Sequence, residues 1–190
     1  MVEPVRGEVV TFLEMTTPGQ LRPGRVVLAL ALTPTTVAEE SLVRATIVRV
    51  GAAYRWPSAV WPADAWETWL ADPRRQSFLL RAGNDTCLDD TCLDDTGPAG
   101  VVGIVETQVH PPHDVEITSF GLVPEHVGTG IGGHALTLAV RLAWDLDHPA
   151  IDEVRRVWLH TSSFDHPRAL ANYRARGFRP YRTQTRGHVA

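Results

Sequence analysis

The spacing of hydrophobic and polar residues changes along the first 110 residues, and each change predicts an element. Val9–Met15 has the pattern of an edge strand. Thr35–Val50 carries a helical pattern that opens on Thr-Pro-Thr-Thr and has two glutamates in its first turns. A short helix is expected at about 63–71. The β-branched runs Ser77–Ala82 and Val101–Val109 predict the two strands of a hairpin.

The second half of the chain alternates strands with helices. Val115–Val123 is a strand closed by Pro124, and a glycine-rich turn at 127–133 leads into a helix. A strand at Val154–His160, a helix that begins near Asp165 and ends at Gly177, and a strand at about 178–183 follow. The first of these helices presents one apolar stripe, made of Ile131, Ala135, Leu138, Ala139, Leu142 and Leu146. The order β, α, α, β, β, β, α, β, α, β predicts an α/β fold with a mixed sheet.

The composition fits a single domain that spans residues 1–190. The chain is 44% hydrophobic and 21% charged, which suits one compact domain with a sizeable core. All 18 basic residues are arginine, so a Schiff-base lysine and the lysine of P-loop NTPases are excluded. The net charge of −4 argues against nucleic-acid and membrane partners. With no signal peptide and no apolar run of membrane-spanning length, we expect a cytoplasmic protein.

The segment 84–99 repeats TCLDD directly and is expected to be an enlarged hairpin loop. Its aspartates lack the register, the mid-loop glycine and the closing glutamate of an EF-hand, so we expect no metal there. Cys87 and Cys92 lie in this loop, which argues against an acyl-cysteine intermediate.

Five aromatic residues are concentrated between Tyr54 and Trp69, namely Tyr54, Trp56, Trp61, Trp66 and Trp69. They can pack a loop and a short helix onto the core, or they can form an aromatic wall around a substrate. The sequence leaves both interpretations open.

The glycine-rich turn at 127–133 has the composition of an anion site. Without Cβ atoms the backbone can approach a diphosphate, and the N-terminus of the following helix adds partial positive charge. Residues 128–133 also match G-x-G-x-x-G of dinucleotide-binding folds. That interpretation is disfavoured, because the turn lies two-thirds along the chain and the next strand ends at His160 without a ribose-binding acid.

Two motifs resemble the GCN5-related N-acetyltransferase (GNAT) superfamily. The first is Leu122-Val123-Pro124 followed by Val127-Gly128-Thr129-Gly130-Ile131-Gly132, which fits the coenzyme A motif of that family. The second fits Asn-x-x-Ala-x-x-x-Tyr-x-x-x-Gly-Phe with His166, Ala169, Tyr173, Gly177 and Phe178 at its positions. Val127 replaces the usual Gln or Arg, and His166 replaces the usual Asn. Main-chain contacts to the cofactor do not depend on either change.

The resemblance implies a mixed, mostly antiparallel twisted sheet with helices on both faces and a splayed central strand pair. It implies acetyl transfer from acetyl-CoA to a primary amine of a small molecule or peptide, by direct attack in a ternary complex. Tyr173 would be the acid that protonates the thiolate, and Glu116 the base. The cofactor would bind at Leu122, Val123, Val127, Gly128, Thr129, Gly130, Ile131, Gly132, Gly133 and His166. No metal is expected, and a homodimer is possible.

Several alternatives stay open at this point. Tyr173 could be a core residue, Glu116 could pair structurally with an arginine, and His166 could satisfy its own helix N-terminus. His113 and Asp114 are weaker candidates for the base, and Arg168 and Arg174 are candidates for contact with the 3′-phosphate. A regular strand would place Glu116, Thr118, Phe120 and Leu122 on one face. The protein could instead be a non-catalytic acyl-CoA-binding module, or, less in keeping with its motifs, a dinucleotide-binding protein.

Overall fold

The structure is a computed structural model that describes residues 7–27, 29–83 and 100–187. The segment that contains Cys87, Cys92 and the TCLDD repeat lies outside the described residues. The strands are β1 (Glu8–Met15), β2 (Leu30–Pro34), β3 (Arg75–Ala82), β4 (Val101–His110), β5 (Asp114–Leu122), β6 (Arg156–Ser162) and β7 (Arg179–Arg186). The helices are α1 (Glu40–Gly51), α2 (Ala63–Leu70), α3 (Gly132–Trp144) and α4 (Ala169–Ala175).

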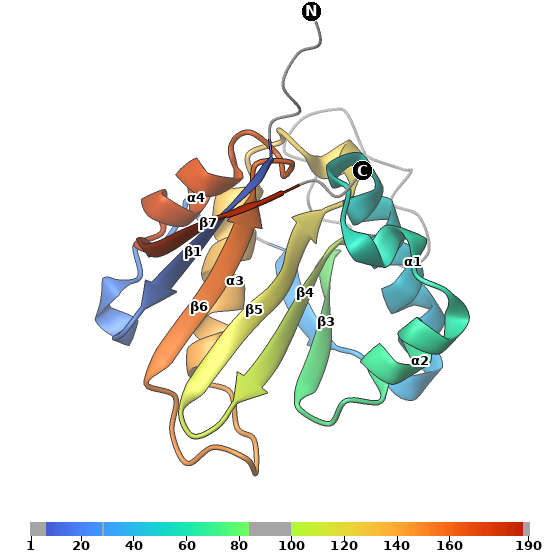
Figure 1. Ribbon diagram of the computed structural model, residues 1–190, viewed down its shortest axis with the longest axis horizontal. Helices are drawn as coiled ribbons and strands as arrows, with labels where there is room; N and C mark the ends of the chain where they lie inside the picture. The colour runs from blue at the N-terminus through green and yellow to red at the C-terminus, as the bar shows by residue number, and fades with distance from the viewer. Residues whose placement is uncertain (1–6, 28, 84–99, 188–190) are drawn as a thin grey trace, which may run out of the picture.

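The strands of the described residues form one sheet in the order β2-β3-β4-β5-β6-β1-β7 (Figure 1). Neighbouring strands are antiparallel except β5 and β6, which are parallel. This confirms the expected α/β class with a mixed, mostly antiparallel sheet. It also separates the fold from the parallel doubly wound sheet that a dinucleotide-binding protein would have.

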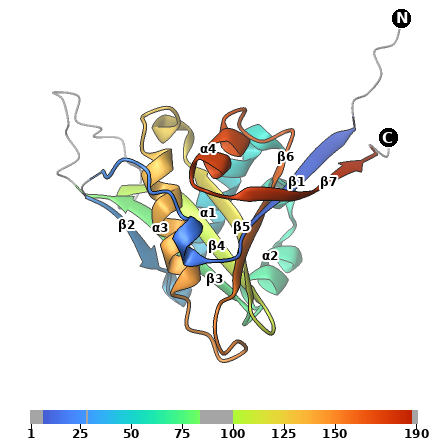
Figure 2. The same cartoon turned by 90° about the vertical axis from the view of Figure 1, so that its left-hand side faces the viewer.

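Helices cover both faces of the sheet, as expected. On one face, Val43, Ile47 and Val50 of α1 and Trp66 of α2 pack against β3 and β4. On the other face, α3 buries Leu136, Ala139, Val140 and Ala143 against β1, β5 and β6. Figure 2 shows α3 and α2 on opposite sides of the sheet. All six residues of the predicted stripe pack against these clusters, but Ile131, Leu138, Leu142 and Leu146 are only partly buried. The most buried face of α3 is rotated from the predicted one and includes Leu136, Val140 and Ala143.

Strand β2 was not predicted. Residues 26–32 read Val-Val-Leu-Ala-Leu-Ala-Leu, a run with no polar alternation to mark a strand. It pairs with β3 as an edge strand, with Leu30 opposite Ala82. Helix α1 also starts later than predicted, because a 3-10 turn at Val37–Glu39 precedes it and the Glu39 carboxylate accepts the Thr36 N–H at 3.1 Å.

The first strand of the sequence lies between β6 and β7, far from β2. The crossing segment, residues 16–27, therefore passes over the N-terminal half of α3 on its way to the other side of the sheet (Figure 2). There the Gly24 N–H donates to Thr137 Oγ1 at 2.9 Å, and the Val27 N–H donates to His134 Nδ1 at 3.0 Å. Burial lowers the pKa of His134, which keeps its imidazole neutral and able to accept.

Candidate active site

The parallel pair β5–β6 separates part-way along its length. Pairing runs from Asp114–Arg156 to Ile117–Leu159, whereas β5 continues to Leu122 and β6 to Ser162. The Val123 N–H donates to the Val102 carbonyl at 3.0 Å, so strand alternation directs the Leu122 N–H away from β4, toward the side of β6. The expected splayed pair is therefore present, with a main-chain donor directed toward its opening.

Gly121 lies beyond the last rung of the β5–β6 pairing and stays paired with Ile104 of β4. A Cβ atom at this position would clash with Val50 Cγ1, so the glycine makes room for α1.

The glycine-rich turn has the geometry of an anion site. Gly128 and Gly130 both have a φ of 88°, which favours glycine, and a Cβ on either would meet no atom within 4 Å. The Ala135 N–H donates to the Ile131 carbonyl at 2.9 Å. The main-chain N–H groups of the residues before Ala135 thus do not take part in the regular hydrogen bonding of α3. They lie at the positive end of the helix dipole. The glycine-rich turn therefore suits the binding of a diphosphate.

Arg176 lies beside this turn, although the sequence analysis named Arg168 and Arg174 instead. A Cβ on Gly133 would clash with Arg176 Nη1, so the guanidinium lies against the first turn of α3. Arg176 Nε is buried and has no hydrogen-bond partner among the described residues. Arg168 and Arg174 are exposed. No spacing in the sequence indicates Arg176, since α4 and the start of α3 meet only in the folded chain.

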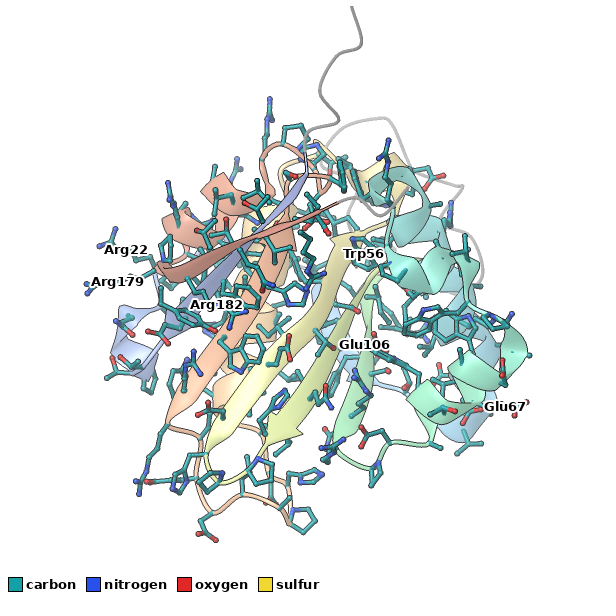
Figure 3. The ribbon with its side chains drawn as sticks, in the orientation of Figure 1. Arg22, Trp56, Glu67, Glu106, Arg179 and Arg182 are labelled. Atoms are coloured by element: carbon teal, nitrogen blue, oxygen red, sulfur yellow. The ribbon has the colours of Figure 1, made fainter. Side chains whose placement is uncertain are left out.

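A cavity of about 520 Å³ lies against the open part of the sheet beside α1 and α2. Residues from well-separated parts of the chain line it, including Tyr54, Trp56, Trp61, Trp69, Glu116, Ser119, Phe120, His160, Asp165 and Tyr173. Trp56 Nε1 donates to Asp165 Oδ1 at 3.1 Å, which ties the aromatic stretch to the loop after β6. Figure 3 shows Trp56 between α1 and the end of β5.

The aromatic stretch therefore serves both interpretations left open by the sequence. Trp66 is buried in the core, whereas Trp56, Trp61 and Trp69 line the cavity. A smaller cavity of about 270 Å³, beside the start of α1, shares Trp69 and Arg75 with the larger one.

Glu116 lies at the last rungs of the β5–β6 pairing, and its side chain is 8% exposed. One carboxylate oxygen, Oε2, is 3.0 Å from His110 Nε2, and the other, Oε1, is 3.1 Å from His160 Nδ1. Within the described part of the chain, the arginine pair considered as an alternative is not among its hydrogen bonds. Neither histidine was named as a site residue from the sequence, because no sequence motif distinguishes a functional histidine near a strand end from any other.

Tyr173 is buried in α4 and reaches the cavity. Its ring packs between Phe120 and Phe178, each with a centroid 6.3 Å away. Burial raises the pKa of Tyr173 well above its usual range, with a smaller contribution from Asp165. The phenol is therefore protonated at neutral pH and can act as a donor.

The expectation that Glu116, Thr118, Phe120 and Leu122 share one face is wrong. Ser119 pairs with Glu106 and Ile117 with Thr107, so Thr118 is an extra residue in a β-bulge. The alternation is shifted by one after the bulge. Ser119 then lies on the face of Glu116 and donates to Glu106 Oε2 at 2.7 Å, whereas Phe120 and Leu122 pack toward α3.

His166 makes a local contact in this structure. Its Nδ1 accepts the Arg168 N–H at 3.1 Å, and its ring meets Tyr54 edge-on at 6.1 Å. Both contacts fit the alternative that the sequence left open, in which His166 serves the turn before α4.

Residues 7–27, 29–83 and 100–187 contain no group of three or more His, Cys, Asp or Glu residues placed to hold a metal ion. Within the same ranges, no helix has the length and apolar character needed to cross a membrane.

Comparisons with known proteins agree with this geometry. A family model described as the acetyltransferase (GNAT) family matches residues 50–178, which is more than half of the chain. No curated protein matches the chain. A GCN5-related N-acetyltransferase from Kribbella flavida has a similar structure, with a TM-score of 0.57 and 18% identity over 93% of this chain and 58% of that one.

Two further solved structures are similar. A GCN5-related N-acetyltransferase from Sphaerobacter thermophilus gives a TM-score of 0.59 and 14% identity over 94% of this chain. An acetyltransferase from Thermus thermophilus gives a TM-score of 0.54 and 25% identity over 82% of this chain and 90% of that one. The chain spans 58% of the Kribbella structure and 50% of the Sphaerobacter structure.

Proposed function

The chain belongs to the acetyltransferase (GNAT) family, and on that premise we propose that it transfers an acetyl group from acetyl-CoA to a primary amine. The observation that carries the proposal is the separation of β5 from β6 beyond Ile117 and Leu159. The opening lies between the glycine-rich turn and the cavity, so one molecule can contact both. Amine and thioester then react directly in a ternary complex.

Acetyl-CoA binds along this opening in the proposed complex. Its diphosphate accepts hydrogen bonds from the main-chain N–H groups of Gly128 to Gly133, with Arg176 beside them, whereas the Val127 N–H donates to the Pro124 carbonyl at 3.2 Å. The thioester carbonyl accepts the Leu122 N–H, a donor directed at the oxygen on which negative charge develops. Val123 follows β5 directly, and His166 lies in the loop before α4.

Each chemical step has a residue suited to it. The amine must lose a proton before it attacks the acetyl carbon, and Glu116, which lines the cavity, supplies the carboxylate of the basic site. As the new C–N bond forms and the C–S bond breaks, the departing thiolate takes the proton of Tyr173. Burial keeps that phenol protonated until it is needed.

The cavity wall indicates the class of acceptor. Tyr54, Trp56, Trp61 and Trp69 present aromatic surface, and the charged residues of the lining are three acids, Glu8, Glu116 and Asp165, and three arginines, Arg55, Arg75 and Arg186. Such a wall attracts ammonium groups and aromatic rings. We propose a cationic or aromatic amine, carried by a small molecule or a peptide.

The direct test is thiol release from acetyl-CoA with a panel of primary amines, together with calorimetric titration of CoA. We expect CoA to bind and at least one aromatic or polycationic amine to give steady turnover. CoA binding without turnover of any amine would contradict catalysis and favour an acyl-CoA-binding role. Stabilisation of the protein against heat by NAD but not by CoA would contradict the assignment of acetyl-CoA as the cofactor.

A further inference from the structure

We infer that His160 Nε2 is the atom that takes the proton from the acceptor amine, and that Glu116 and His110 position it. The inference rests on the proposed function and refines it, because the resemblance assigned the base to the Glu116 carboxylate. It starts from the hydrogen-bonded chain His110–Glu116–His160, which three neighbouring strands bring together.

The carboxylate of Glu116 is poorly placed to accept a proton itself. Its side chain is 8% exposed, and each of its oxygens is already within hydrogen-bond distance of an imidazole nitrogen. An ionised carboxylate can only accept, so both imidazoles must donate to it. A further proton on either oxygen would displace one of these bonds.

This requirement for two donors then fixes the histidine tautomers. If His160 Nδ1 carries the proton that it donates to Glu116 Oε1, the neutral ring leaves Nε2 as a bare acceptor. His160 lines the cavity and its side chain is 37% exposed, so an acceptor amine can reach this ring. His110 donates through Nε2 in the same way, but it does not line the cavity.

Aromatic neighbours hold both rings in place. The His160 ring lies 5.7 Å from Phe12 of β1, and the His110 ring lies 5.5 Å from Trp158 of β6. Two contacts from different strands therefore orient His160, one to a carboxylate and one to a ring. A general base held in this way keeps its lone pair directed at the substrate.

The charged groups around His160 come from every strand next to it. Glu116 from β5 is the negative neighbour, and Arg182 from β7 lies over Phe12 at 4.4 Å. Arg75 from β3 interacts electrostatically with Glu116, and Glu8 and Arg186 border the cavity as a pair at 3.8 Å. Arg55 and Asp165 also line the cavity, and Asp165 Oδ1 accepts a hydrogen bond from Trp56 Nε1. Among these described groups, Glu116 is the carboxylate within hydrogen-bond distance of the ring.

The step balances in atoms and charge. The ammonium proton moves to His160 Nε2, and the amine nitrogen bonds to the acetyl carbon. As the C–S bond breaks, the thiolate takes the proton of Tyr173, and the second proton lost by the nitrogen restores the Tyr173 phenol. The imidazolium beside Glu116 then returns its proton to water.

The decisive variant is His160→Asn. The asparagine amide can still donate to Glu116 as Nδ1 does, but it has no counterpart of Nε2. We expect kcat/KM to fall about 100-fold and the acid limb of its pH profile to disappear. The matched control is His113→Gln on the β4–β5 turn. The Nδ1 atom of His113 has no hydrogen-bond partner among the described residues. This variant should keep the wild-type kcat/KM and the acid limb of the pH profile. A His160→Asn enzyme with the original acid limb would overturn the inference.

Two further measurements separate the base from the residue that positions it. In Glu116→Gln the acid limb should persist, because His160 still carries Nε2. Loss of the limb in this variant would identify Glu116 as the base. Added imidazole should restore part of the activity of His160→Ala, which a purely structural histidine would not allow.

Nitrogen-15 spectra of the imidazoles test the tautomer without any acceptor. In mildly alkaline solution the wild-type protein should show His160 protonated at Nδ1 and His110 at Nε2. A proton on His160 Nε2 would overturn the inference even if acetyl transfer is confirmed. Absence of turnover with every amine would instead overturn acetyl transfer, and the role of Nε2 with it.

Discussion

At the scale of single residues, Tyr173 combines a packing role with a chemical one. Tyr173→Phe keeps the ring between Phe120 and Phe178 and removes the hydroxyl, for which the structure shows no hydrogen bond to the described residues. We expect kcat to fall about 100-fold, because the thiolate loses its acid, while CoA affinity and thermal stability stay the same. Tyr181→Phe on the exposed strand β7 is the control for loss of a phenol. Equal rates in the two variants would show that Tyr173 only packs.

Burial of Tyr173 also makes stability depend on pH. Its pKa is raised in the folded protein, so between the ordinary tyrosine pKa of about 10 and the raised value the unfolded chain loses a proton that the folded chain keeps. Stability conferred by this group is complete below about pH 10 and falls above it, by at most about 1.4 kcal/mol per pH unit. Urea unfolding at alkaline pH should show this loss in the wild type and a smaller loss in Tyr173→Phe. Parallel curves would contradict it.

At the scale of elements, the glycine-rich turn depends on backbone conformation. Alanine at Gly128 or Gly130 would meet no atom, but a φ of 88° costs it about 1 kcal/mol or more. We expect each variant to fold and to bind CoA about 10-fold more weakly by calorimetry, because alanine disfavours the backbone conformation of the turn. Gly19→Ala, which also enters open space but has no positive φ, should bind as the wild type does.

Sequence patterns predicted the elements that have one apolar and one polar face. They failed to predict elements whose two faces have the same polarity. The stripe of α3, the hairpin strands and both motifs follow from periodicity and spacing. Strand β2 was missed because its apolar run has no alternation, and the face of Phe120 was wrong because one extra residue, Thr118, shifts the register. The roles of His110, His160 and Arg176 depend on contacts between strands and helices distant in sequence, so no local pattern could reveal them.

At the scale of the whole molecule, the crossing segment joins two ends of the sheet through one buried hydroxyl. Thr137 is 1% exposed, accepts the Gly24 N–H at 2.9 Å and donates to the Gly133 carbonyl at 2.8 Å. Thr137→Val keeps the shape but leaves the Gly24 N–H without a partner, so the free energy of unfolding should fall by about 1–3 kcal/mol in urea titrations.

The same variant should also weaken CoA binding, because Gly133 opens the helix that begins at the glycine-rich turn. Thr137→Ser retains the hydroxyl and is expected to lose less stability and no affinity. If the valine variant is as stable as the wild type, packing alone holds the crossing segment.

The position of β1 between β6 and β7 has a consequence for biosynthesis. Val10 pairs with Ser162 on one side and with Gln184 on the other, so its partners are synthesised after the other described strands of this sheet. The nascent chain must carry the strand Glu8–Met15 unpaired until β6 and β7 have been made, and the sheet closes only afterwards. Protection of Glu8–Met15 by a chaperone would then affect the yield of folded protein more than the rate at which any later helix forms.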